Sequence, residues 1–471
     1  AAAGAAAAPA AAARSIAVLP LVNESGSARD DYFSDGMADE LTAALDKVGG
    51  LRVASRTSAF ALKDRRLTVQ EIGKELNVGA VLEGTVRRDG NRLRVTARLT
   101  NTADGLTMWS DTYERDMKDV FRVQDDITQA IVGALRVALG GPPGGGRRGT
   151  SDLEAYDLYL RGRYYWSQRG AASLRTAAGY FSQAIARDPS YADAYAGLAD
   201  ATALLPIYGD TPLDSVLPGA RRAAERALML DSTLAEAHTT LGLLLKSTGD
   251  WDASAREFQH AIALNPSYAT AHQWYAEVLM ITNQVDPAIA EMQRAEQLDP
   301  LSPVIAAELS YCLALAGRAD DAHTYAVRAK TLDPALWTSY VFPAWGDLFA
   351  HHTLEAVREL DTAVRLDTTI DAVRGSQAYA YAVAGFADSA RGVLAAIEPR
   401  ALRPGGSPFG VALGFLGLGE RDSALAWLGR AAERRDPWLY AASLEPAWYD
   451  PIRGDPRFAA IRRSMGLDRH P

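Results

Sequence analysis

Small and apolar residues recur along the second half of the chain with a period of 34 residues. One series is alanine at every place except one, where isoleucine stands: Ala227, Ala261, Ala295, Ala329, Ala363, Ile397 and Ala431. A second series keeps the same period: Ala220, Ser254, Ala288, Ala322, Ala356, Ala390 and Ala424. Small residues at fixed places let two helices approach closely, so this pattern predicts helix pairs that stack on their neighbours and share one core.

Larger residues also keep fixed places within each period. One unit reads His238, Leu241, Gly242, Leu245, Ser254, Phe258, Ala261 and Pro266, and proline returns at Pro300 and Pro334. These units resemble the tetratricopeptide repeat (TPR) family, which implies a superhelical solenoid that binds proteins or peptides. We count eight units, over residues 152–191, 192–234, 235–268, 269–302, 303–336, 337–370, 371–404 and 405–438. The second unit contains an insertion near 206–219, and we expect Pro343 to kink or shorten a helix in the sixth.

Residues 15–139 show a different pattern, in which short apolar runs alternate with helical periodicity. Strands are expected at 15–19, 51–54, 80–88, 92–100 and 106–113, and the turn Asp89-Gly90-Asn91 predicts a hairpin. We expect one helix to begin at Asp35, and a second to begin with a capping box between Thr68 and Glu71. A longer amphipathic helix follows, with Val120, Ile127, Ile131 and Leu135 on its apolar face. The predicted fold is therefore a small α/β domain with a mixed sheet, followed by an all-α TPR solenoid.

This first region resembles the TolB N-terminal-like domain of bacterial signalling proteins. The residues that carry the resemblance are Ser15–Pro20, Asp35-Gly36, Ser55–Ser58, Leu82-Glu83-Gly84 with Val86-Arg87, and Trp109. The resemblance implies a domain that lies between a membrane-spanning segment and TPR units. It also implies an effector upstream, such as a winged-helix regulator, a nucleotide cyclase or a protein kinase, and a periplasmic or cell-surface location. The end of the chain, from Tyr449 to Leu467, is similar to the end that such proteins share.

The composition of the remaining segments narrows the function. Residues 1–14 are an Ala/Pro-rich linker or tail, residues 140–151 a Gly/Pro linker, and residues 439–471 a capping segment, so we expect a part of a longer protein. A net charge of −9 argues against nucleic-acid binding, which needs a basic surface. No apolar run is long enough for a membrane span within this chain. We expect the single cysteine, Cys312, to be buried as a small apolar residue.

The sequence contains no recognisable catalytic, cofactor-binding or metal-binding constellation. His238 and His272 occupy equivalent places in consecutive units, which predicts a structural role. The adjacent pair His351-His352 lacks the spacing of a zinc motif. We therefore expect no enzyme. An enzyme would need a site between the domains, and a cleft that gathers Asp, His or Ser side chains with strongly shifted pKa values would indicate one.

The concave face of the solenoid is the predicted protein-binding groove. In TPR arrays the first helix of each unit lines this face, and its ninth and thirteenth places point inward. Those places give Glu277, Ile281, Tyr311, Leu315, Trp345, Phe349, Tyr379 and Val383. Two interpretations stay open: the aromatic residues anchor a partner, or they pack between repeats. In the first case, Trp345→Ala weakens partner binding and leaves thermal stability nearly unchanged.

The leading hypothesis is a non-enzymatic protein-interaction scaffold that binds a protein or peptide through this groove. One alternative is a self-assembling subunit of a filament or tube, because the segment 437–467 is rich in aromatic residues, among them Trp438, Tyr440, Trp448, Tyr449 and Phe458. Another alternative is the sensory part of a signalling protein whose effector lies upstream.

Overall fold

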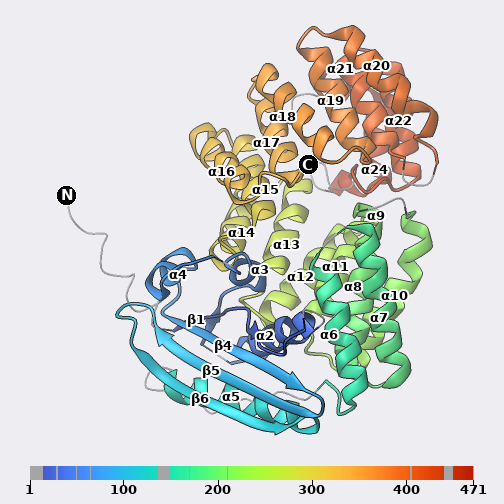
Figure 1. Cartoon of the computed structure of the whole chain (residues 1–471). Helices are drawn as coiled ribbons and strands as arrows, with labels where there is room; N and C mark the ends of the chain where they lie inside the picture. The colour runs from blue at the N-terminus through green and yellow to red at the C-terminus, as the bar shows by residue number, and fades with distance from the viewer. Residues whose placement is uncertain are drawn as a thin grey trace.

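A computed structural model describes residues 14–27, 30–48, 50–63, 65–135, 149–168, 170–208, 211–403, 406–439 and 449–469. The Ala-rich tail, most of the Gly/Pro linker, and the aromatic residues Tyr440 and Trp448 lie outside these ranges. Figure 1 shows an N-terminal sheet with flanking helices, from which a long array of helices curves away and then returns over the middle of the chain. The predicted fold class is confirmed.

The N-terminal sheet is mixed, as the sequence predicts. Its strands are β1 (Ser15–Val18), β2 (Val22–Asn23), β3 (Arg52–Val53), β4 (Ala80–Asp89), β5 (Arg92–Asn101) and β6 (Thr107–Asp116). They run in the order β3-β1-β4-β5-β6, and β2 pairs with β4. Strands β1, β2 and β3 form the parallel pairs, whereas β4, β5 and β6 form an antiparallel meander. The hairpin closes at Gly90-Asn91, where Asp89 pairs with Arg92.

The two faces of this sheet are covered by different elements. Helices α2 (Asp31–Asp46) and α5 (Val120–Leu135) bury one face, where Ile16, Leu82 and Val95 are fully covered. Helices α3 (Arg56–Phe60) and α4 (Val69–Glu75) lie on the other side, where Ala17 and Val81 form a core together with Leu301 of the solenoid. The sheet thus packs against the repeats as well as against its own helices.

The helix starts in this domain match the sequence in one case and differ in the other. The capping box of α4 is confirmed, with both the Thr68 and the Glu71 side-chain bonds present. The helix expected at Asp35 begins earlier, at Asp31, because Tyr32 and Phe33 extend its buried face. Asp35 therefore lies inside α2 and forms an ion pair with Lys63 at 2.8 Å instead of capping the helix.

The solenoid contains eight antiparallel helix pairs in the part of the chain that the structure describes. We call the first helix of each pair the A helix and the second the B helix. The pairs are α6 (Leu153–Ser167) with α7 (Ala171–Arg187), α8 (Ala192–Ala203) with α10 (Leu213–Leu230), α11 (Ala235–Lys246) with α12 (Trp251–Leu264), α13 (Ala269–Ile281) with α14 (Val285–Leu298), α15 (Pro303–Leu315) with α16 (Ala319–Leu332), α17 (Thr338–Phe349) with α18 (Thr353–Leu366), α19 (Asp371–Val383) with α20 (Ala387–Ile397), and α21 (Pro408–Gly417) with α22 (Arg421–Glu433). A short helix, α9 (Leu205–Tyr208), lies in the insertion of the second unit.

The periodic small residues explain the close packing of these pairs. All seven residues of the first alanine series are fully buried. In the third pair, a Cβ atom at Gly242 would lie 2.7 Å from the Phe258 ring, so only glycine lets this ring contact the A helix. Ser254, a member of the second series, donates a buried hydrogen bond to the Gly242 carbonyl oxygen at 2.7 Å. The periodic small residues therefore mark the places where the paired helices pack closely.

Pro343 does not divide the first helix of the sixth unit into two. Helix α17 runs from Thr338 to Phe349 with Pro343 inside it. Pro343 is the sixth residue of this helix and cannot form the backbone hydrogen bond to the Ser339 carbonyl group. Whether the helix bends there stays a prediction.

The described residues of the last segment, 437–439 and 449–469, which we call the C-terminal segment, fold back over the solenoid. It contains α23 (Asp450–Arg453), α24 (Pro456–Ser464) and the 3-10 turn η5 (Leu467–Arg469). Tyr449 and Phe458 are buried and stack at 5.6 Å. The indole nitrogen of Trp251, on α12, donates to the Met465 carbonyl oxygen at 2.7 Å. The described aromatic residues of this segment thus pack within the chain itself.

Candidate functional site

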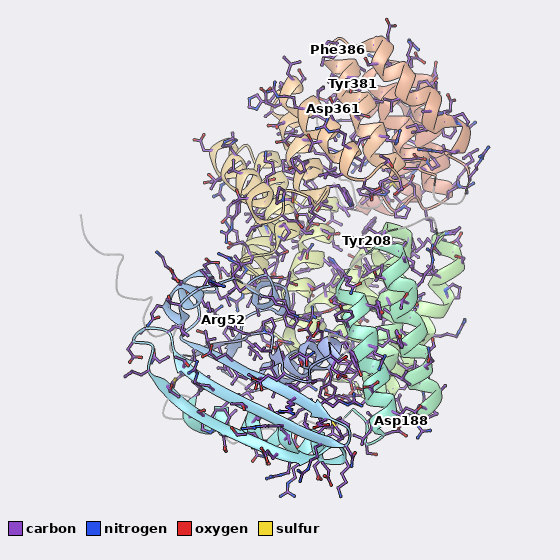
Figure 2. All side chains as sticks on the ribbon, in the orientation of Figure 1. Arg52, Asp188, Tyr208, Asp361, Tyr381 and Phe386 are labelled. Atoms are coloured by element: carbon purple, nitrogen blue, oxygen red, sulfur yellow. The ribbon has the colours of Figure 1, made fainter. Side chains whose placement is uncertain are left out.

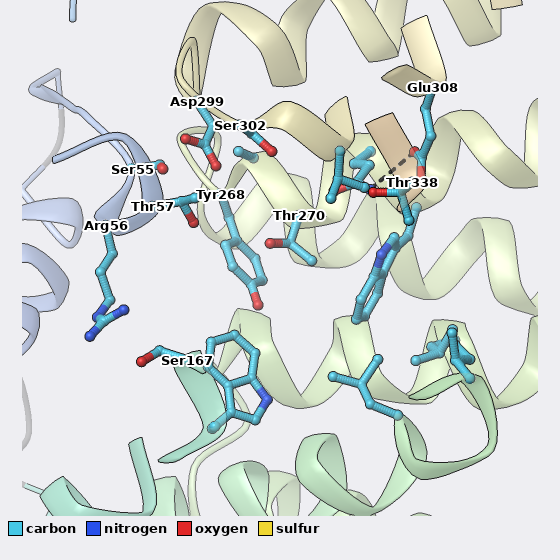
Figure 3. Close-up of a pocket in the computed structure, with 18 of the residues that line it drawn as sticks. Ser55, Arg56, Thr57, Ser167, Tyr268, Thr270, Asp299, Ser302, Glu308 and Thr338 are labelled. Carbon is cyan, nitrogen blue, oxygen red and sulfur yellow. Dashed lines mark hydrogen bonds between the residues drawn. The ribbon is translucent and has the colours of Figure 1, made fainter. Parts of the chain in front are cut away.

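Three parts of the chain enclose a cavity of about 700 Å³. One wall comes from α2, α3 and the loop before α3, and the opposite wall comes from the A helices between α6 and α17. Pro437 and Trp438 close a further side. Figure 3 shows side chains from the N-terminal domain and from the repeats converging on this space. The cavity is of the size that small-molecule sites have.

A buried polar contact fixes the N-terminal domain against the repeats at the edge of the cavity. The Ser58 hydroxyl, on α3, donates to the Asp299 carboxylate and accepts from the backbone N–H of Leu301 at 2.8 Å. The backbone N–H of Ser55 donates to the Leu298 carbonyl oxygen at 3.1 Å. Burial raises the pKa of Asp299, and hydrogen bonds from neighbouring hydroxyl groups oppose that rise. These contacts join segments that are more than 240 residues apart, and no sequence spacing predicts them.

A second contact joins α2 to the first repeat. Arg163, on α6, donates to the Asp39 carboxylate at 3.0 Å, and Arg56 lies 3.5 Å from the same carboxylate. Burial is also the main cause that raises the pKa of Asp35, although Lys63 opposes it. The wall formed by α2 is therefore an ordered network of ion pairs.

Acidic groups outnumber basic groups around the cavity. The lining residues in the described chain include three cationic side chains, Arg56, Arg163 and Lys246. The carboxyl groups are Asp35, Asp39 and Asp46 on α2, and Glu236, Glu277, Asp299, Glu308 and Asp333 on the solenoid. Buried carboxylates with no nearby cation are costly. The surplus of negative charge therefore favours a positively charged occupant.

The predicted groove residues do not form one open surface. Glu277 and Tyr311 line the cavity, and Glu277 accepts a hydrogen bond from Lys246. Ile281 and Trp345 are buried; Leu315, Phe349 and Tyr379 are half-buried; Val383 is 40% exposed. Trp345 packs edge-on against Tyr311, with ring centroids 5.7 Å apart, and lies 6.5 Å from Trp438. Whether these residues bind a partner stays a prediction.

The cavity meets part of the condition set for an enzyme, because it gathers Asp and Ser side chains. Burial raises the pKa of Asp46 to about 7. No histidine of the described chain lines the cavity, whereas five serines do: Ser55, Ser167, Ser247, Ser267 and Ser302. Within the same residues, no cluster of three or more side chains is suited to hold a metal ion.

His238, His272 and the arginines of β5 have structural explanations. His238 and His272 contact Glu257 and Glu291 through Nδ1 at 2.7 and 2.6 Å, so both fasten an A helix to its B helix. The arginines of β5 pair across the sheet, with Arg98 bonded to Glu83 and Arg94 3.5 Å from Glu114. Cys312 is buried, as predicted.

Comparisons with known proteins give a partial match in sequence. No family model matches the chain. A 250-residue stretch is 36% identical to "Putative adenylate cyclase 3" of Rhizobium meliloti (strain 1021). The match covers 52% of this chain and 42% of that protein, so the chain corresponds to less than half of this relative.

Solved structures that are similar to this chain are TPR proteins, and the likeness concerns the fold alone. YrrB, described as "a TPR protein with an unusual peptide-binding site", is 22% identical, covers 40% of this chain and 92% of its own, and has a TM-score of 0.29. PilF of Pseudomonas aeruginosa is 18% identical, covers 50% of this chain and 99% of its own, and has a TM-score of 0.36. The assignment to the TPR fold stands on the helix pairs themselves, whereas the TolB-like resemblance stays a prediction.

Proposed function

We propose that this chain is a non-enzymatic protein-interaction scaffold of a bacterial protein. The observation that carries the proposal is the solenoid of A and B helices, which offers a long surface. The part of the concave face next to the N-terminal domain is covered. The exposed partner surface is therefore sought toward the later repeats, where Val383 and Phe386 are 40% and 48% exposed. Figure 2 shows Phe386 at the far end of the solenoid from the sheet, with Tyr381 near it.

Photo-crosslinking in cells tests this proposal. A photoreactive residue replaces Val383, a predicted groove position, and in a matched variant replaces Leu366, which is 41% exposed on a B helix. The proposal expects a discrete protein adduct from position 383 and none from position 366. Equal crosslinking at both positions, or none at either, contradicts a groove-directed scaffold.

A second candidate is the sensory part of a signalling protein whose effector lies upstream. The partial match to a relative named as an adenylate cyclase favours it, because most of that relative lies outside the match. Under this proposal the upstream effector changes its activity when the solenoid is occupied. Comparing effector activity in the longest native chain with and without the bound partner tests it, and an activity that never changes rejects it.

The cellular location of the chain and its self-assembly are two further proposals. We propose a periplasmic or cell-surface location by analogy with TolB-like proteins, and fractionation with the native upstream sequence intact tests it. A purely cytosolic pool would reject it. In the described part of the chain, no helix has both the length and the apolar character to span a bilayer.

The proposal of a filament or tube rested partly on the aromatic residues near the end of the chain. Two of them, Tyr449 and Phe458, are buried within the chain and do not support it. Light scattering over a wide concentration range decides this alternative.

A further inference from the structure

The cavity has one end where a single carboxylate dominates. Glu308, on α15, lines the cavity and is only 8% exposed. Gln273, on α13, donates to its Oε2 atom at 3.0 Å. No hydrogen bond or ion pair reaches its Oε1 atom from the residues that the structure describes. Figure 3 shows the carboxyl group pointing from the A helix into the space, near Thr338. A buried acceptor is thus left available to an occupant.

The groups around Glu308 do not neutralise it. The nearest cation, Lys246, is bonded to Glu277, and the charge of Glu277 acts on Glu308 in the same direction as burial does. Both effects raise the pKa of Glu308 well above its usual range. An ionised carboxylate in such a place is stabilised by a cation that enters with it. When Glu277, Glu308 and Lys246 are all ionised, this end of the cavity has one uncompensated negative charge.

The other walls at this end are aromatic. Trp274, Trp337, Phe342 and Trp438 all line the cavity, and Tyr311 lies one helical turn beyond Glu308. The Tyr311 and Thr338 hydroxyl groups are buried and make no hydrogen bond within the described residues. Aromatic faces attract cations, and they do so most strongly when water is excluded. A carboxylate set among aromatic rings therefore suits a cation that carries an apolar body.

We propose that this end of the cavity binds a small organic cation, an ammonium or guanidinium group on an aromatic or aliphatic body, with Glu308 as its counter-ion. The volume of about 700 Å³ accommodates a small molecule. The N-terminal domain and Trp438 restrict access from two sides, which favours a free small molecule over an extended chain. Because such a ligand contacts the A helices and Trp438 together, its occupancy would stabilise their association. The proposal does not depend on the scaffold function.

The test uses the whole chain and a panel of arylalkyl and alkyl amines, each matched to a carboxylic acid on the same body; tryptamine with indole-3-propionic acid is one such pair. Calorimetric titration and the thermal midpoint report binding. We expect at least one amine to bind saturably and to raise the midpoint, while its acid counterpart does neither. Absence of binding by every amine, or equal binding by the acids, would overturn the proposal.

Two variants locate the site. Glu308→Gln keeps the shape and the contact to Gln273 but removes the charge, and should weaken amine binding roughly tenfold or more, since a charge-assisted hydrogen bond is lost. The matched control is Glu359→Gln, another partly buried glutamate, which is bonded to Lys330 and does not line the cavity. Phe342→Leu should weaken binding several-fold and serves if the Glu308 variant does not fold. Unchanged affinity in Glu308→Gln and in Phe342→Leu would place the amine elsewhere and refute the assignment.

Discussion

Replacing Trp345 with alanine separates the two interpretations of the aromatic ladder. The indole is 3% exposed, its ring centroid lies 5.7 Å from that of Tyr311 and 5.6 Å from that of Phe342, and its Nε1–H donates to the Ser376 hydroxyl at 3.0 Å. Truncating a buried tryptophan to alanine costs about 3–5 kcal/mol. Most of this comes from lost packing, and the lost hydrogen bond accounts for about 1 kcal/mol of it. We therefore expect Trp345→Ala to lower the free energy of unfolding by about 4 kcal/mol.

The matched variant is Trp345→Phe, which keeps one aromatic ring but removes the donor and the volume of the second ring. It should cost about 1–2 kcal/mol, because Ser376 retains its bond to the Ala372 carbonyl oxygen at 3.1 Å. Urea unfolding followed by circular dichroism measures both variants. Hydrogen exchange on α17 and α19 then localises the loss, because repeat arrays need not unfold in one step. A change below about 1 kcal/mol in Trp345→Ala would mean that the ring is not buried, and the groove-anchor interpretation would regain its basis.

Three other perturbations test separate parts of the structure. Ser58→Ala should cost about 1–3 kcal/mol and increase hydrogen exchange at the interdomain contact, because it leaves the buried Leu301 N–H without its acceptor; exposed Ser182→Ala is the control, and equal effects would contradict the contact. Gly375→Ala places a Cβ atom 2.1 Å from the Gly410 carbonyl oxygen and should cost about 2–3 kcal/mol, whereas Gly392→Ala, with nothing within 4 Å, should be neutral or stabilising; thermal unfolding of both variants distinguishes strain from propensity. Burial raises the pKa of Glu40 to about 8, above its unfolded value of 4.5, so folding takes up a proton; stability from this group is full at low pH and is lost as the pH rises toward about 8. The thermal midpoint should therefore fall less steeply over this range in Glu40→Gln, and an unchanged slope would refute the assignment.

The local elements were predictable because local residues determine them. The Thr68 and Glu71 pair caps its helix through bonds that span three residues. The alanine series marks helix contacts because its members are buried where two helices cross, and all but Ile397 are small. The predicted helix start at Asp35 was wrong. An acidic residue is common at a helix start, but Asp35 lies inside α2, where the Lys63 side chain forms an ion pair with it.

The cavity was not predictable, because it arises from contacts between distant segments. Glu277 and Tyr311 were selected from their repeat places, but nothing in the sequence placed Ser58 beside Asp299 or Trp438 beside Trp345. The repeat rule indicates which face of an A helix points inward. It does not indicate what covers that face. Here the cover consists of the chain's own N-terminal domain and C-terminal segment, and it converts much of the groove into interior.

This closure changes how binding by the solenoid is to be understood. A partner that occupied the concave face along its whole length would have to displace α3 from Asp299 and α24 from Trp251, and so break the Leu301–Ser58 bond and the Trp251–Met465 bond. Each such bond contributes about 1 kcal/mol net, but the buried side chains that separate with them contribute more. Binding at the exposed later repeats needs no such opening. A small cation beside Glu308, in contrast, gains from the closed arrangement because its contacts come from the A helices and from Trp438 together. The two kinds of ligand therefore make opposite demands on the same interface, and a cavity ligand would oppose any partner that needs the groove open.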